Sequence, residues 1–108
     1  MAARKFSSQL LSPNQDTIIM TGGNYKDSTV VVNFCNQNNF PVNIWLAYSD
    51  NTGQYTTSDY LLFQYPIAPY IPFQFKGIAV ETLCSLIART DSVNVSVIVY
   101  GVDDTNNS

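Results

Sequence analysis

Apolar and polar residues alternate with a period of two along residues 92–102. One face of this segment would carry Val93, Val95, Val97 and Val99, and the other Asn94, Ser96, Ile98 and Tyr100. Side chains alternate between two faces only on an extended backbone. The segment is therefore predicted to be a β-strand with one face in the core.

The same alternation appears in two earlier segments, residues 28–35 and 41–49. Val30, Val32 and Phe34 share a face in the first segment. In the second, one face carries Val42, Ile44, Leu46 and Tyr48, and Trp45 lies at mid-strand on the other. The polar run 36–39 between the two segments is a turn signal. We therefore expect an antiparallel hairpin with a long connection.

Shorter apolar runs between turn signals predict the remaining strands. They lie at residues 17–20, 57–68, 73–75, 78–80 and 83–90. Residues 5–12 are either a first strand or an extended arm. About eight short strands and no convincing helix indicate an all-β protein, an antiparallel β-sandwich with immunoglobulin-like or jelly-roll topology. We expect an arm or strand at 1–12, one sandwich domain at 13–102 and a polar tail at 103–108.

Three prolines interrupt the middle of the chain at every third position. Pro66, Pro69 and Pro72 have no backbone N–H to donate to a sheet. Such a segment is confined to an edge strand or a polyproline-like connection. An exposed edge near 65–72 could pair with a strand of a neighbouring subunit.

Charged residues are scarce in this chain of 108 residues, so most of its surface must be uncharged. Only 12% of the residues are charged, about half the usual share, and the net charge is −3. A surface with so little charge is poorly protected against association, so contact with other protein is expected. The few Lys and Arg residues form no basic patch, which disfavours nucleic acid. No apolar run is long enough for a transmembrane helix, and no membrane partner is expected.

The first residues and the two cysteines indicate the cellular compartment in which the chain is made. Arg4 and Lys5 are followed by no apolar stretch, which disfavours a secretory signal. Synthesis in a reducing cytoplasm favours buried free thiols at Cys35 and Cys84, with a disulfide as the minority alternative.

The sequence contains few residues that could carry out catalysis. Histidine is absent, which removes Ser-His and Cys-His catalysis and the commonest zinc ligand. Glu81 is the only glutamate, and no second carboxylate lies at a spacing that indicates glycoside hydrolysis. We expect no enzyme activity, no cofactor and no metal site.

Aromatic residues provide the candidate contacts. Five of the seven tyrosines fall between positions 48 and 70. The candidate interface residues are Trp45, Tyr48, Tyr55, Tyr60, Tyr65, Tyr70 and Ile71. Aromatic enrichment is typical of protein interfaces. The alternative is a carbohydrate-binding module or host-recognition fibre domain, in which Tyr55, Tyr60 or Tyr70 would line a shallow sugar-binding groove.

The last third of the chain resembles small virion accessory proteins of tailed bacteriophages. The resemblance covers about 35 residues: 75–81 around Lys76-Gly77, the strand 86–90, and the strand 93–102 that ends in Gly101-Val102. The connection 69–72 resembles the proline-bearing segment that often comes before. This chain has Thr82-Leu83-Cys84-Ser85 where the group usually has Gly-Asp.

This resemblance implies a structural role with no catalytic residues to transfer. Such proteins decorate or cement capsids, or ring the neck and tail. The expectation is a non-enzymatic virion protein, made in the bacterial cytoplasm. It would dock in many copies as a homo-oligomer and against capsid, neck or tail subunits.

Overall fold

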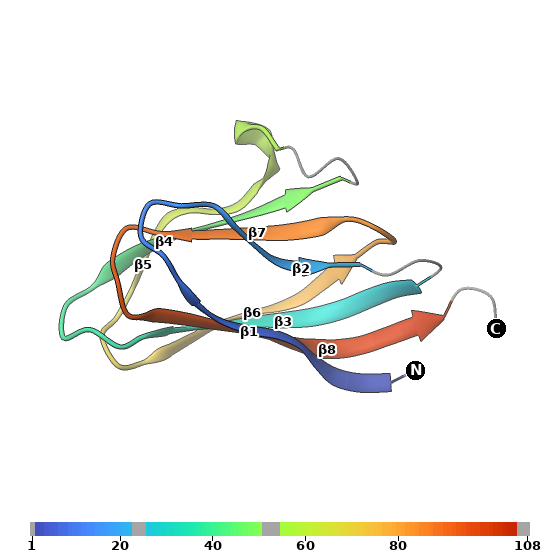
Figure 1. The fold of residues 1–108 in the computed structure, drawn as a ribbon, viewed down its shortest axis with the longest axis horizontal. Helices are drawn as coiled ribbons and strands as arrows, with labels where there is room; N and C mark the ends of the chain where they lie inside the picture. The colour runs from blue at the N-terminus through green and yellow to red at the C-terminus, as the bar shows by residue number, and fades with distance from the viewer. Residues whose placement is uncertain (1, 23–25, 51–54, 106–108) are drawn as a thin grey trace.

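A computed structural model of the chain describes residues 2–22, 26–50 and 55–105 (Figure 1). The described residues form eight strands and one short 3-10 turn. They are β1 (Ala2–Leu11), β2 (Thr17–Thr21), β3 (Lys26–Asn36), β4 (Val42–Ser49), η1 (Thr57–Asp59), β5 (Tyr60–Ile67), β6 (Pro72–Val80), β7 (Ser85–Thr90) and β8 (Val95–Thr105). No helix in this part of the chain is long and apolar enough to cross a membrane.

The strands form two four-stranded antiparallel sheets that face each other, which confirms the predicted all-β sandwich. The strand orders are β1-β8-β3-β6 and β2-β7-β4-β5. Pairing is nested, because β1 pairs with β8, β2 with β7, β3 with β6 and β4 with β5. This is a two-stranded ribbon rolled over on itself, the jelly-roll topology. In an immunoglobulin-like sandwich the first two strands of the chain would share a sheet, whereas here they lie in different sheets.

The core lies between the inner faces of the two sheets and follows the alternation seen in the sequence. Val30, Val32 and Phe34 of β3 are fully buried, as are Ile44 and Leu46 of β4. On β8 the buried positions are Val95, Val97 and Val99, whereas Val93 lies in the preceding turn and is exposed. Burial of these side chains is the main stabilising contribution to the fold.

Several boundaries differ from those expected. Residues 57–59 form η1 rather than the start of a strand. Residues 73–75 and 78–80 belong to one strand, because β6 passes Gly77 with a register shift and a φ of 77°. β8 continues to Thr105, so residues 103–105 are strand and not tail; the rest of the expected tail, 106–108, lies outside the described residues. Residues 1–12 contain β1, which pairs with β8 over its length.

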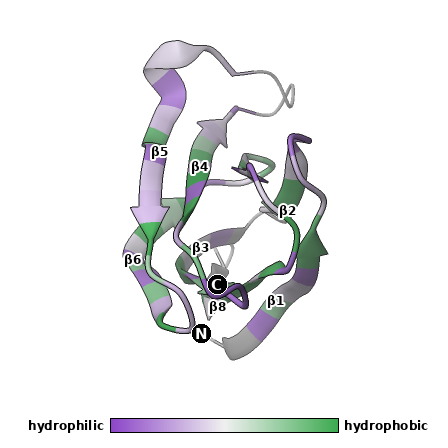
Figure 2. Ribbon diagram, turned by 90° about the vertical axis from the view of Figure 1, so that its left-hand side faces the viewer, coloured by the Kyte–Doolittle hydropathy of each residue, from purple (hydrophilic) through white to green (hydrophobic). Residues whose placement is uncertain are grey.

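The two long sides of the sandwich are closed differently. Figure 2 places β1 and β2 on one side and β5 and β6 on the other. On the first side, Ser7 donates a hydrogen bond to the carbonyl of Ile19, and Gln9 donates one to the carbonyl of Ile18 at 3.2 Å. On the second side, the rings of Tyr65 and Phe73 lie 4.7 Å apart between their centroids.

Candidate functional site

The structure distributes the predicted contact residues over four places. Trp45, Tyr55 and Tyr60 come together on the outer face of the sheet β2-β7-β4-β5. Tyr48 packs against the core. Tyr65 lies on the side between β5 and β6. The last two, Tyr70 and Ile71, belong to the connection after β5 and are largely exposed.

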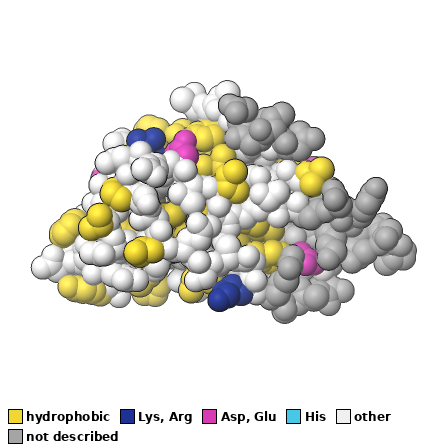
Figure 3. Space-filling view, in the orientation of Figure 1, with side chains coloured by type: hydrophobic (Ala, Val, Ile, Leu, Met, Phe, Trp, Pro, Cys, Tyr) yellow, Lys and Arg dark blue, Asp and Glu magenta, His cyan; other side chains and the backbone are white. Residues whose placement is uncertain are grey.

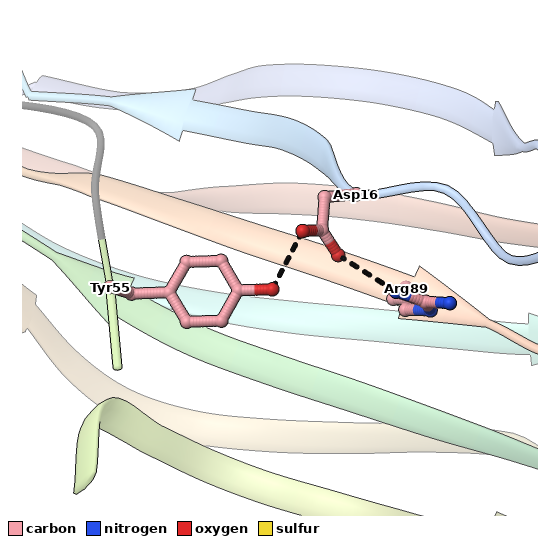
Figure 4. A network of polar contacts seen from close by, with 3 residues as sticks. All are labelled: Asp16, Tyr55 and Arg89. Atoms are coloured by element: carbon pink, nitrogen blue, oxygen red, sulfur yellow. Dashed lines mark hydrogen bonds and ion pairs between the residues drawn. The ribbon is translucent and has the colours of Figure 1, made fainter. Parts of the chain in front are cut away.

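A polar network joins three elements across the outer face (Figure 4). The hydroxyl of Tyr55 donates a 2.7 Å hydrogen bond to the Asp16 carboxylate, which lies in the turn before β2. Arg89 of β7 lies 3.7 Å from the same carboxylate. Burial and the hydrogen bond to Asp16 raise the pKa of Tyr55 well above its ordinary value.

Aromatic rings complete a closed circuit of contacts around this network. The Arg89 guanidinium lies 6.0 Å from the centre of the Trp45 ring, and Trp45 meets Phe63 edge to face at 6.3 Å. Phe63 meets Tyr60 at 5.1 Å, and Tyr60 meets Tyr55 at 5.6 Å. These are ordinary edge-to-face separations.

The circuit places Tyr55 and the start of β5 against the outer face of the sheet. Ala47 and Ile87 are register partners on the same face as Trp45 and Arg89, yet only 1% and 5% of their surfaces are exposed. Tyr55 must reach across this face from the β4–β5 connection to Asp16, which lies beyond β7. The tyrosines here therefore serve mainly to cover the sheet, and Phe63, 60% exposed, remains available for contact.

Tyr48 is a structural residue. Its hydroxyl accepts a 2.9 Å hydrogen bond from the backbone N–H of Glu81, and burial raises its pKa. Its ring packs against the core cluster. This contact ties β4 to the turn after β6, so Tyr48 presents no free ring to a partner.

Two buried asparagines tie together the turns at one end of the sandwich. The Asn36 side chain donates hydrogen bonds to the carbonyls of Phe40, at 2.8 Å, and Ile67, at 3.3 Å. Its oxygen accepts bonds from the backbone and side-chain nitrogens of Asn38 at 3.0 and 3.1 Å. Asn38 in turn donates to the carbonyl of Val93 at 2.7 Å. Turns 37–41, 68–71 and 91–94 are thus joined; we call them the asparagine-tied end.

Large apolar side chains project from this end. The exposed fractions are 47% for Phe40, 67% for Tyr70, 61% for Ile71 and 54% for Val93. Figure 1 shows the three turns at the end opposite the marked termini, and Figure 3 shows hydrophobic side chains gathered there. Residues 37–41 and 68–71 contain no charged residue. Exposed apolar groups held by buried hydrogen bonds are typical of a preorganised contact surface.

The side of the sandwich along β5 is the second exposed apolar surface. β5 ends its sheet, so its outer edge has no strand neighbour within the described part of the chain. Leu61, Phe63 and Tyr65 are exposed on it; we call these three residues the β5 side. Main-chain pairing with another strand, considered from the sequence, is disfavoured because Pro66 lacks an N–H and Gln64 has a φ of 47°.

The geometry places the three tyrosines of the sugar-binding alternative at two locations. Tyr60 begins β5, whereas Tyr70 follows the far end of that strand, about 23 Å away along an eight-residue strand. Tyr55 and Tyr60 contact each other and are only partly exposed.

Within the described residues, no three His, Cys, Asp or Glu side chains lie close enough together to hold a metal ion. Cys35 and Cys84 are both free thiols. They lie toward opposite ends of the sandwich, since Cys35 is near the end of β3 and Cys84 precedes β7.

Sequence reasoning missed the residues that build the asparagine-tied end. The candidate interface residues do not include Asn36, Asn38, Phe40 or Val93. The sequence pattern places Asn36 only in a turn. One signal was present: Phe40 is a large apolar residue between a polar run and Pro41. The contacts of Asn36 with Ile67 and Tyr70 join segments far apart in the chain and have no local signature.

No protein-family model, curated protein or solved structure matches this chain.

Proposed function

We propose that this protein is a non-enzymatic structural subunit of a phage virion that docks in many copies against other protein subunits. The observation that carries the proposal is the asparagine-tied end. It holds four exposed apolar side chains on turns that buried hydrogen bonds join to one another. Such a surface can bind a complementary apolar patch without first ordering its own loops.

The rest of the surface supports a docking role over a chemical one. The tyrosines on the outer sheet face are engaged with each other and with Asp16, and they form a cover. Several carboxylates have structural partners: Asp91 accepts hydrogen bonds from Asn43, and Asp103 accepts one from Ser28. Low overall charge suits a subunit whose surface meets neighbours of the same assembly.

The virion as the setting rests on the resemblance of residues 75–102 to phage accessory proteins and on the fold. Jelly rolls recur in viral capsid proteins and also in lectins, so the topology supports the proposal by analogy. Many copies would turn a small contact at each asparagine-tied end into firm attachment.

The experiment compares virions with and without the protein after heating or osmotic shock. Virions that lack it should assemble and then lose infectivity several times faster than wild-type particles. Added wild-type protein should restore resistance, whereas the double variant Tyr70→Asn, Ile71→Asn should not. Asparagine tolerates the φ of 63° at position 70, so the turn is not strained by the change.

The matched control is Leu10→Asn, which changes an equally exposed apolar residue on β1, 64% exposed. It should restore resistance as well as wild-type protein does. If particles without the protein were as robust as the wild type, the structural role would be refuted. If the double variant restored resistance fully, docking through the asparagine-tied end would be refuted.

A further inference from the structure

The first strand of the chain is held to the sandwich mainly by its backbone. β1 ends its sheet, and its ladder is formed with β8. Among the side chains of residues 5–11, Leu11 is buried and Phe6 packs half-buried against the core. By contrast β6, the other edge strand of the same sheet, places four large side chains in or against the core. Release of β1 therefore exposes less apolar surface than release of β6.

The contacts of β1 match one partner strand, an identical β1. Its ladder with β8 runs from Ala2↔Asp103 to Leu11↔Val95 and shifts register between Lys5 and Ser7. Ser7 and Gln9 also donate hydrogen bonds to carbonyls of β2. A foreign strand would need the same irregularity and the same side chains, whereas β1 of a second copy satisfies every one of these contacts unchanged.

The turn that joins β1 to β2 favours an extended form. It comprises residues 12–16, four of which are exposed. Pro13 disfavours a helical backbone at Ser12 and pushes that residue toward the extended region. Asn14 has a φ of 59°, in the left-handed region, which extension of the turn would relieve. Short strained turns of this kind favour exchange of a terminal strand between copies.

Opening the turn disrupts few contacts and leaves enough reach. Asn14 would give up its 2.7 Å backbone hydrogen bond to the carbonyl of Thr90, whereas Asp16 can keep its contact with Tyr55. Five extended residues span about 17 Å, compared with about 10 Å between packed sheets. The turn can thus reach a second sandwich whose β1–β2 side faces its own (Figure 2).

We propose that two copies of this chain exchange their first strands, so that β1 of each copy pairs with β8 of the other in the register that it has within one chain. The turn 12–16 lies beside Thr90, next to the asparagine-tied end, so the two such ends of an exchanged pair stay close together. The use of the pair as a docking unit with two ends rests on the proposed function.

The test is an engineered disulfide between Ser8 and Ile98, which are register partners with exposed side chains. Ser8→Cys and Ile98→Cys are combined with Cys35→Ser and Cys84→Ser, which remove the native thiols. The protein is refolded at about 0.5 mM to favour association, separated by size and oxidised. The dimer fraction should carry disulfides between chains, visible as doubled mass after denaturation without reduction. The monomer fraction should carry them within one chain.

Two changes in the turn test the same pairing from the other direction. Deletion of residues 13–15 leaves two residues to cross between the sheets and should raise the ratio of dimer to monomer at least about tenfold. Insertion of Gly-Ser-Gly-Ser after Ser12 relieves the turn and should lower that ratio.

The absence of a dimer fraction, a dimer whose disulfides all lie within single chains, or a folded deletion variant that stays monomeric would each overturn the proposal. Wild-type protein that restored virion resistance without forming exchanged pairs would refute only this inference. Exchanged pairs that form while neither they nor the monomer restore resistance would refute the docking function and leave strand exchange standing.

Discussion

At the scale of single residues, asparagine and tyrosine side chains make the hydrogen bonds that hold segments of the chain in place, a role that charged side chains often have on protein surfaces. Asn36 is fully buried and uses both its amide nitrogen and its oxygen in hydrogen bonds, to two residues of turn 37–41 and to the last residue of β5. Tyr55 spans the outer face of a sheet to reach Asp16. Asn36 thus fixes turn 37–41 beside the end of β5, and Tyr55 is fixed beside Asp16. Apolar side chains are thus displayed on turns that uncharged hydrogen bonds hold in place.

Replacing Asn36 by aspartate should lower the free energy of unfolding by at least about 3 kcal/mol at neutral pH. The introduced carboxylate cannot donate to the carbonyls of Phe40 and Ile67, and it would be charged in a buried site. Part of the loss should be recovered in acid, where the carboxyl group is protonated and can donate one bond. Urea denaturation at several pH values measures the effect.

The control is Asn39→Asp, since Asn39 is exposed and lies in the same turn. It should change stability by less than about 0.5 kcal/mol. Equal losses in the two variants would contradict the structural role assigned to Asn36.

Tyr55 should ionise at higher pH than a free tyrosine side chain, whose ordinary pKa is about 10. Burial first, and then the Asp16 carboxylate, favour its neutral form. Because the pKa is raised in the folded state, this stabilisation is complete below pH of about 10 and falls as the pH rises further. Ultraviolet titration of the wild type and of Tyr55→Phe isolates the signal of this one residue.

In Asp16→Asn the pKa of Tyr55 should fall but stay above the ordinary value, since burial is the larger cause. If the absorbance that Tyr55→Phe lacks appeared at the ordinary tyrosine pKa of about 10, the hydrogen-bonded network of Figure 4 would be refuted.

At the scale of strands, the alternation of side chains was predictable and the irregularities were not. The segments 28–35 and 41–49 correspond to β3 and β4, and the strand expected at 92–102 is β8, which begins at Val95 and ends at Thr105. The pattern revealed them because half-buried antiparallel strands alternate regularly. The hairpin expected between the first two segments is wrong, because β3 and β4 lie in different sheets. The bulge at Gly77 and the register shifts along β5 interrupt that pattern. Because of these irregularities, the sequence pattern did not show that β6 is one continuous strand or that Leu61 and Phe63 are exposed. Such irregularities depend on neighbouring strands, so a single strand's sequence does not reveal them.

Gly101 should be intolerant of any side chain, because β3 passes too close to it. A Cβ at this position would lie 2.1 Å from the carbonyl oxygen of Thr29 and 2.8 Å from the Cα of Val30. Gly101→Ala must push β8 and β3 apart and should cost at least about 3 kcal/mol of unfolding free energy. Chemical denaturation provides the measurement.

Gly77→Ala is the matched comparison. Its φ is positive, but nothing lies within 4 Å of the added Cβ, so only conformational strain of about 1–2 kcal/mol is expected. If Gly77→Ala were the more damaging of the two, the close approach of β3 and β8 would not limit stability.

At the scale of the whole molecule, the sequence predicted the β-sandwich class but not the order of the strands in the two sheets. Alternating strands without helices indicated two packed antiparallel sheets. Jelly-roll and immunoglobulin-like sandwiches are built from the same kind of strand, so the strands alone do not distinguish the two topologies. What separates them is long-range pairing such as that of β1 with β8. The candidate contact residues were chosen by residue type, and two of them, Tyr70 and Ile71, are exposed at the asparagine-tied end; their contact with a partner stays a prediction. Tyr48 was missed as a core residue because its hydroxyl partner, the Glu81 N–H, lies on another strand's turn.

The place of β8 between β1 and β3 has a consequence for biosynthesis. β8 is the last of the eight strands to leave the ribosome, yet it pairs with a strand on each side at the middle of its sheet. A nascent chain that ends before β8 would expose two unpaired strand edges and the valine-rich face that β8 covers. This sheet can therefore close only after translation has passed Thr105, at the end of β8.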